Sequence, residues 1–235
     1  MALNFRIIFG ICLFSIAMAA LESAVVVYLR ALYYPDGFTV VFRIIDQQIL
    51  LIEIARELAT IVMLVSIGML VGKTVKDQFA YFLISFAVWD VFYYVWLKVF
   101  INWPASILDW DILFLIPFTW LGPVLAPVLC SFTMFGLGIV LLKSNSGITA
   151  RAWMLLLTGS AVILYTFLVD YGTIIVNNGF YNDFANLLQN KQFIDIVSSY
   201  IPTEYNWFLL GLGEILILTA ITFIWRARQD RKSVV

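Results

Sequence analysis

The chain of 235 residues is 63% hydrophobic and only 12% charged, and its mean hydropathy is +0.98. A soluble domain usually contains about 25% charged residues, so this composition indicates an integral membrane protein whose first partner is the lipid bilayer. The formal net charge of −1 provides no general basic surface, and we expect no nucleic-acid partner. Because the chain contains no histidine, bis-histidine haem, Ser–His catalysis and histidine-based zinc sites are excluded, and no cofactor is predicted.

Three apolar segments occupy the first hundred residues, and each is long enough to cross a bilayer as a helix. They cover about residues 5–29, 49–72 and 79–101. The first contains Glu22 and is too long for the apolar part of a signal peptide, so we expect it to be retained. The third should end at about Ile101, because Asn102-Trp103-Pro104 follows and a residue before proline disfavours the helical conformation.

The segment 103–123 differs from its neighbours because it contains three tryptophans and three prolines. Its apolar core is too short to span a membrane, so we expect a re-entrant or interfacial helix that lies as a lid over the outer side of the bundle. The candidate lid residues are Trp103, Asp109, Trp110 and Asp111. In the alternative interpretation, the two aspartates only cap a helix and face solvent.

Three further apolar segments follow, at about residues 124–143, 151–176 and 205–225. The polar stretch 177–204 separates the last two, and we expect a short amphipathic helix at about residues 181–196. No domain boundary is visible, so the sequence predicts one all-α domain over residues 1–235, built as a single bundle of six transmembrane helices. Cys12 and Cys130 both lie in apolar segments, so no disulfide is expected.

The distribution of basic residues predicts how the bundle is oriented. Cytoplasmic segments of membrane proteins are enriched in lysine and arginine, and the chain ends in a basic tail. Six crossings place nine of the fourteen basic residues on the same side as that tail: Arg6, Lys73, Lys76, Lys143, Arg151, Arg226, Arg228, Arg231 and Lys232. Both termini are therefore expected in the cytoplasm.

Ionisable side chains inside the apolar segments are the candidates for function, because they are costly in a bilayer and usually face other helices or a water-filled cavity. Glu53, Arg56 and Glu57 share one helical face, at positions i, i+3 and i+4. With the predicted orientation, the candidates fall between the outer surface and the middle of the membrane. The full set is Glu22, Glu53, Arg56, Glu57, Asp90, Tyr94, Lys98, Asp170 and Glu214.

Two interpretations of this set remain open. The first is structural: ion pairs and hydrogen bonds between helices, such as Arg56 with Asp90 or Glu57. The second starts from the excess of carboxylates over cations, because an unpaired carboxylate in a low dielectric must hold a proton or a cation. In both interpretations we predict that Arg56 is the central cation and contacts at least one acid from a different helix.

Three functions are compatible with these features. A carboxylate-rich polar cavity in the outer half of the bilayer could bind or conduct a cation, a proton or a small amphipathic ligand. The chain could instead be an accessory subunit or assembly factor with membrane-protein partner subunits. It could also be a membrane enzyme with carboxylate acid/base chemistry on a lipid or isoprenoid. Asp90 and Asp170 could then form an aspartyl dyad, and Gly211-Leu212-Gly213-Glu214 resembles the GxGD element of intramembrane aspartyl proteases, with Glu in place of Asp.

Two segments resemble uncharacterised bacterial polytopic membrane proteins with no assigned activity. They are WD-x2-YY, from Trp89 to Tyr94, and WDILFLIP-x2-W-x-GP, from Trp110 to Pro123. The resemblance covers at most the first four helices. It implies a bacterial inner membrane as the location and implies nothing about the chemistry.

Overall fold

The computed structural model describes residues 4–35, 37–39, 46–144, 147–182, 187 and 190–232, without the side chains of Gln47 and residues 228–232. Within these ranges, six helices are long and apolar enough to cross a membrane: α1 (Phe5–Tyr33), α2 (Gln47–Val71), α3 (Val75–Ile101), α4 (Leu125–Lys143), α5 (Ala150–Asn177) and α7 (Trp207–Lys232). A short helix α6 (Lys191–Val197) and two strands, β1 (Trp110–Phe114) and β2 (Trp120–Pro123), complete the described elements. The predicted all-α membrane protein with six membrane-spanning helices is confirmed.

The long helices are mostly apolar, and polar residues mark several of their ends. The Thr74 hydroxyl accepts a hydrogen bond from the Asp77 N–H at 3.2 Å and starts α3. The same helix ends at Ile101, as expected, and Asn102 follows in the left-handed conformation with φ 55°. Lys98 bonds the carbonyl oxygens beyond this end, which it reaches from the last helical turn.

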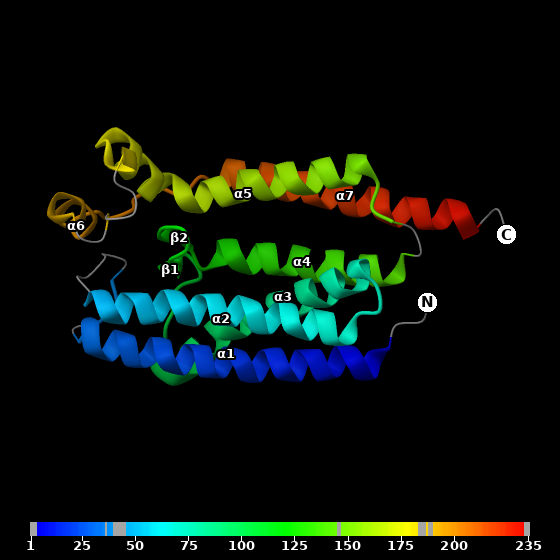
Figure 1. Ribbon diagram of the computed structural model, residues 1–235, viewed down its shortest axis with the longest axis horizontal. Helices are drawn as coiled ribbons and strands as arrows, with labels where there is room; N and C mark the ends of the chain where they lie inside the picture. Colours follow the sequence, from blue (N-terminus) through cyan, green and yellow to red (C-terminus); the bar gives the residue numbers. More distant parts are fainter. Residues whose placement is uncertain are drawn as a thin grey trace.

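The helices form two groups (Figure 1). Helix α3 packs against α1, α2 and α4, whereas α5 pairs with α7, and the two groups meet where α4 contacts α7. Small residues allow the close approaches: Ser15 of α1 and Ser85 of α3 are buried and hydrogen-bonded at 2.8 Å. Gly159 and Gly213 face each other where α5 crosses α7.

The two ends of the bundle differ in character. Helix α1 begins and α7 ends at the same end, which also carries the short connections α2–α3 and α4–α5 (Figure 1). We call it the termini end. The opposite end carries the strands and α6, and we call it the hairpin end. This arrangement agrees with six crossings, while the side of the membrane that each end faces stays a prediction.

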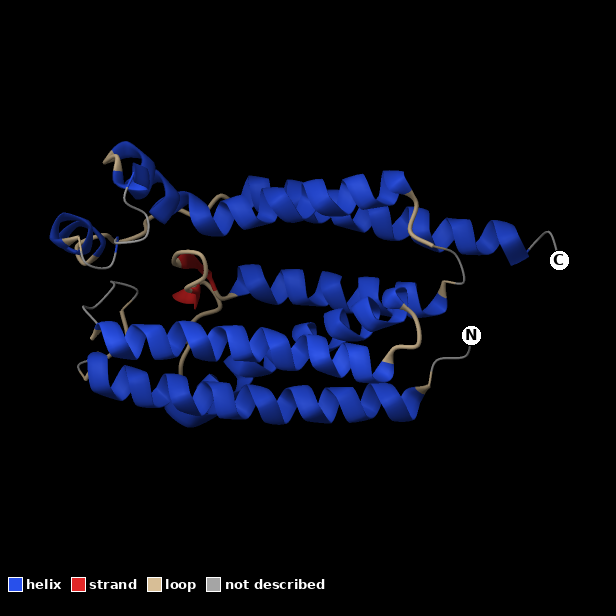
Figure 2. Cartoon of the chain, viewed as in Figure 1, coloured by secondary structure: helices blue, strands red, loops and turns tan. Residues whose placement is uncertain are grey.

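The segment between α3 and α4 is a β-hairpin and not the helix that we expected (Figure 2). Strands β1 and β2 are antiparallel, with Trp110 opposite Pro123 and Ile112 opposite Leu121. Its prolines and large aromatic and branched residues favour extended backbone over helix. A two-stranded hairpin is only marginally stable alone, so packing against α4 and α5 must hold it.

Several other boundaries differ from the expectation: α3 begins at Val75, about one turn earlier than predicted, and α7 continues to Lys232, beyond the predicted end at residue 225. Helix α1 continues to Tyr33, about one turn further than predicted, so Arg30 lies within it. The amphipathic helix expected at about residues 181–196 is shorter and later, because α6 covers Lys191–Val197. Residues 183–186, 188 and 189 of the expected helix lie outside the described part of the chain.

Candidate functional site

A cavity of about 480 Å³ lies between the α1–α4 group and the α5–α7 pair. The hairpin closes it at one end, where Asp111 to Leu115 and Trp120 line it. Towards the termini end the lining is apolar, with Phe79, Leu83 and Leu156 among its residues. Its size is typical of small-molecule sites, which range from about 300 to 1,000 Å³.

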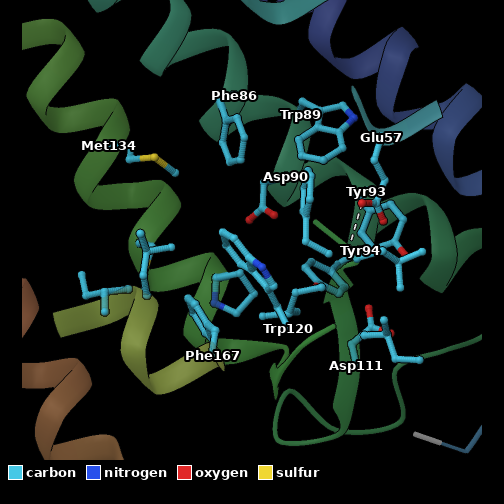
Figure 3. Close-up of a pocket in the computed structure, with 18 of the residues that line it drawn as sticks. Glu57, Phe86, Trp89, Asp90, Tyr93, Tyr94, Asp111, Trp120, Met134 and Phe167 are labelled. Carbon is cyan, nitrogen blue, oxygen red and sulfur yellow. Dashed lines mark hydrogen bonds between the residues drawn. The ribbon is translucent and has the colours of Figure 1, made fainter. Parts of the chain in front are cut away.

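Most of the predicted polar residues line this one cavity: Glu22, Glu53, Arg56, Glu57, Asp90, Tyr94, Asp111 and Glu214. They come from α1, α2, α3, β1 and α7, so the fold brings together residues that are far apart in the sequence. Figure 3 shows the Asp90 carboxylate projecting from α3 into the space between Phe86, Met134 and Trp120. The cavity therefore combines an apolar body with a charged part near the hairpin.

Arg56 pairs with two acids and joins α2 to α1 through one of them. Its Nη1 atom pairs with Glu22 of α1, and its Nε atom donates to Glu53 of its own helix at 2.7 Å. Thr60 donates a further hydrogen bond to Glu22 at 2.9 Å. The expected contact with an acid of another helix is present. Within the described residues, however, its ion pairs are with Glu22 and Glu53, and not with Asp90 or Glu57.

Glu57 connects α2 to the hairpin. Its Oε2 atom accepts a hydrogen bond from the Leu115 N–H at 2.9 Å, just beyond the end of β1. A backbone N–H at membrane depth needs a partner inside the protein, and the carboxylate supplies one. Glu57 is therefore a structural contact for the hairpin as well as a cavity residue.

Asp90 and Glu214 face the cavity from α3 and α7, and α4 supplies a hydroxyl to each. The Ser131 hydroxyl donates to Asp90 at 2.8 Å, and the Thr133 hydroxyl donates to Glu214 at 2.6 Å. Neither acid forms an ion pair with any residue that the structure describes. Together with Glu57, which likewise has no ion pair among the described residues, they are the carboxyls that a proton or an added cation would have to neutralise.

Arg30 and Asp111 form a buried ion pair that fixes the hairpin to α1, with Nη2 and Oδ1 2.9 Å apart. The guanidinium carbon also lies over the rings of Phe38 and Trp103, 3.7 Å and 3.8 Å from their centres. Burial raises the pKa of Asp111 to about 6, although the Arg30 charge and a hydrogen bond from Tyr94 act in the opposite direction. The pair therefore joins β1 to α1 inside the protein.

The structure places five predicted residues outside the cavity lining: Trp103, Asp109, Trp110, Lys98 and Asp170. Trp103 covers Arg30, and Asp109 accepts hydrogen bonds from the backbone of Ala105 and Ser106. Trp110 packs edge to face on Tyr205 at 5.9 Å. These residues pack on or near the hairpin and do not line the cavity.

Lys98 and Asp170 contact the segments beyond their own helices. The Lys98 ammonium donates to the backbone oxygen of Pro104 at 2.9 Å. Asp170 accepts a hydrogen bond from Tyr200, and burial together with this carboxylate raises the pKa of Tyr200 to about 12. Asp170 therefore bonds a residue near α6, whereas Asp90 bonds Ser131 of α4. These hydrogen bonds do not join the two aspartates as the expected dyad.

Gly213 of the Gly211-Leu212-Gly213-Glu214 element has a packing role, whereas a Cβ atom on Gly211 would meet nothing within 4 Å. A Cβ atom on Gly213 would lie 2.6 Å from the Ile163 side chain and 2.9 Å from the Gly159 carbonyl oxygen. Gly213 is thus required for the close crossing of α5 and α7. This contact accounts for the glycine without any proteolytic chemistry.

Sequence reasoning missed four residues of the site: Arg30, Trp89, Ser131 and Thr133. Arg30 follows directly after the first predicted segment, residues 5–29, and nothing local in the sequence signals an ion pair with Asp111. Ser131 and Thr133 lie within the fourth apolar segment, where a hydroxyl commonly bonds its own helix backbone. Only the packing of α3 and α7 against α4 shows that both hydroxyls have carboxyl partners.

Comparison of the chain with protein-family models, with curated proteins and with solved structures finds no match in any of the three. The function is therefore argued from the geometry of the cavity.

Proposed function

We propose that this polytopic membrane protein binds a small amphipathic molecule with a positively charged head in the cavity between its two helix groups. The observation that carries the proposal is the pair Asp90 and Glu214. Both line the cavity, and neither has an ion-pair partner among the described residues. An amine or another organic cation would neutralise them, and the apolar part of the cavity would hold its hydrocarbon body.

The aromatic lining supports the same class of ligand. Five aromatic residues line the cavity, and all five are labelled around Asp90 in Figure 3: Phe86, Trp89, Tyr93, Trp120 and Phe167. A cation over an aromatic face gains about 0.5–2 kcal/mol, and gains most when it is desolvated. An inorganic cation would be a poorer fit, because a small hard ion needs several oxygen ligands and this surface is mostly carbon.

As the location, we propose a bacterial inner membrane with both termini in the cytoplasm. The basic residues at the termini end support this orientation. The hairpin end, with Asp90, Glu57 and the Arg30–Asp111 pair near it, would then face the periplasm. Ligand would enter the cavity from the outer half of the bilayer.

The chain contains its own reporter for the binding test. Cys130 lines the cavity, whereas Cys12 on α1 does not. The experiment measures the rate at which N-ethylmaleimide alkylates each cysteine, by mass spectrometry of the two peptides. The rate is compared at increasing concentrations of dodecylamine and of dodecanol. We expect dodecylamine to slow the alkylation of Cys130 and to leave Cys12 unchanged, and dodecanol to protect neither.

Asp90→Asn provides the decisive variant, because the amide keeps a hydrogen bond with Ser131 but loses the charge. The concentration of dodecylamine that half-protects Cys130 should rise at least about tenfold in this variant. Asp109→Asn is the matched control, because Asp109 lies outside the cavity and should leave protection unchanged. Equal protection by the alcohol and the amine, or unchanged protection in Asp90→Asn, would refute the proposal.

A further inference from the structure

The cavity contains a second polar group, the guanidinium of Arg30, which the positively charged head of the proposed ligand would not contact. Three contacts fix it: Nη2 bonds Asp111 at 2.9 Å, and the rings of Phe38 and Trp103 stack on it. A guanidinium held in one plane presents its remaining N–H groups in fixed directions. Arg30 is only 7% exposed, yet it lines the cavity.

Two buried N–H donors of the lining have no hydrogen-bond partner among the residues that the structure describes. They are Nη1 of Arg30 and Nε1 of Trp89, whose side chain is 5% exposed. An unsatisfied buried donor destabilises a fold by about 1–3 kcal/mol, and by more when it is charged. Both residues line the cavity, but Figure 3 shows the Trp89 ring nitrogen directed away from Asp90, so Arg30 Nη1 is the donor that an acceptor oxygen of a ligand would satisfy.

We infer that the ligand is zwitterionic: next to its positive charge it carries an acidic oxygen, of a phosphate or a carboxylate, that accepts a hydrogen bond from Arg30 Nη1. This inference rests on the proposed function, because Asp90 and Glu214 hold the positive part. The hydrocarbon chain occupies the apolar part of the cavity, as in the proposed function.

Electrostatics favour a zwitterion over a simple anion. The described lining has two cationic side chains, Arg30 and Arg56, and six acids: Glu22, Glu53, Glu57, Asp90, Asp111 and Glu214. Arg56 is already paired with two of these acids, and Arg30 with Asp111. A lone anion would meet this negative surplus, including Asp111 beside its own binding group. An ammonium a few atoms away within the same ligand cancels that repulsion.

The test compares four amphiphiles with the same dodecyl chain in the Cys130 protection assay at pH 7.5. They are dodecylphosphoethanolamine, N-dodecylglycine, dodecylamine and dodecyl phosphate. We expect at least one of the two zwitterions to half-protect Cys130 at a tenfold lower concentration than dodecylamine, and dodecyl phosphate to give no protection. The better of the two zwitterions identifies the acidic oxygen as phosphate or carboxylate.

A paired variant assigns the effect to Arg30. The double substitution Arg30→Gln/Asp111→Asn replaces the ion pair by a neutral pair of similar shape, and it should abolish the advantage of the zwitterion while dodecylamine still protects. Lys98→Gln is the control. Lys98 is also a basic residue at the hairpin end of the bundle, but it lies outside the cavity. If the double variant does not fold, the ligand series on the wild-type protein decides alone.

Two outcomes would overturn the inference, and they are distinguishable from failure of the proposed function. If dodecylamine protects as well as both zwitterions, the acidic oxygen is not recognised and the cation site stands alone. If the zwitterion keeps its advantage in the folded double variant, Arg30 is not its partner. If neither the amine nor the zwitterions protect Cys130, the proposed function itself fails.

Discussion

At the scale of single residues, the acids of the cavity divide by their partners. Glu22 and Glu53 are paired with Arg56, and Asp111 is paired with Arg30. Among the described residues, Asp90 and Glu214 have hydroxyl or thiol partners and no ion pair. The first group holds helices and hairpin together, so its removal should primarily change stability. The second group faces the cavity without a cation, so its removal should primarily change binding.

The clearest stability prediction concerns Arg56. In Arg56→Ala, Glu22 and Glu53 lose their cation in a partly buried position, and breaking such a pair costs about 3 kcal/mol. Arg56→Lys should recover part of this loss, because one ammonium cannot reproduce contacts from both Nη1 and Nε. Thermal melts in detergent measure the difference.

Arg6→Ala serves as the control for Arg56→Ala, because Arg6 is exposed near the start of α1 and its loss should cost less than about 0.5 kcal/mol. Equal melting temperatures for Arg56→Ala and Arg6→Ala would show that Arg56 does not organise these acids.

The spacing of charged residues along the sequence was sufficient to predict part of this site. The positions of Glu53, Arg56 and Glu57 at i, i+3 and i+4 indicated a shared face, and all three line the cavity. Counting depth along each helix likewise brought Glu22 and Asp90 to compatible levels. The same method wrongly placed Lys98 and Asp170 among the residues of the cavity, because the depth of a residue along a helix does not specify which way its side chain points about the helix axis. Their side chains bond segments at the hairpin end instead.

At the scale of elements, the hairpin is the feature that the sequence pattern indicated least well. Its failure to span was predictable from its short apolar core, but its β-structure depends on contacts from elsewhere in the chain. Glu57 of α2 bonds the Leu115 N–H, and Trp120 stacks on Phe167 of α5 with a ring distance of 6.3 Å. Such partners lie far away in the sequence, so local propensity could not reveal them.

The crossing of α5 and α7 provides a prediction at the same scale. A methyl group at Gly213 would lie within 3 Å of Ile163 and of the Gly159 backbone, so Gly213→Ala should destabilise the protein by about 1–3 kcal/mol. Gly211→Ala, two residues away, would meet nothing within 4 Å and should be neutral or stabilise by up to about 1 kcal/mol. Melting temperatures that shift in the same direction for both variants would contradict the assigned packing.

At the scale of the whole molecule, hydropathy was sufficient to predict the six long helices, because the membrane requires long apolar segments whose backbone is satisfied internally. The division into two groups with a cavity between them was not predictable, since all six segments are similarly apolar and their neighbours are set by small residues and buried polar contacts. The orientation across the membrane stays a prediction.

Cysteine labelling tests that orientation. In a background without Cys12 and Cys130, a cysteine at Lys73 lies at the termini end and one at Glu204 lies at the hairpin end, and both positions are exposed. A membrane-impermeant maleimide added to intact cells should label Glu204→Cys and should leave Lys73→Cys unlabelled until the cells are lysed. Labelling of both positions in intact cells would disprove the six-crossing topology, and labelling of Lys73→Cys alone would reverse the orientation.

The central claim is that the cavity holds a charged amphiphile, and a density map of the protein purified with dodecylphosphoethanolamine tests it most directly. We predict elongated density between the two helix groups, with its polar end beside Asp90 and Arg30 and its chain directed towards Leu83 and Leu156. A cavity that contains only water, or a chain bound with its polar head at the termini end, would contradict the claim.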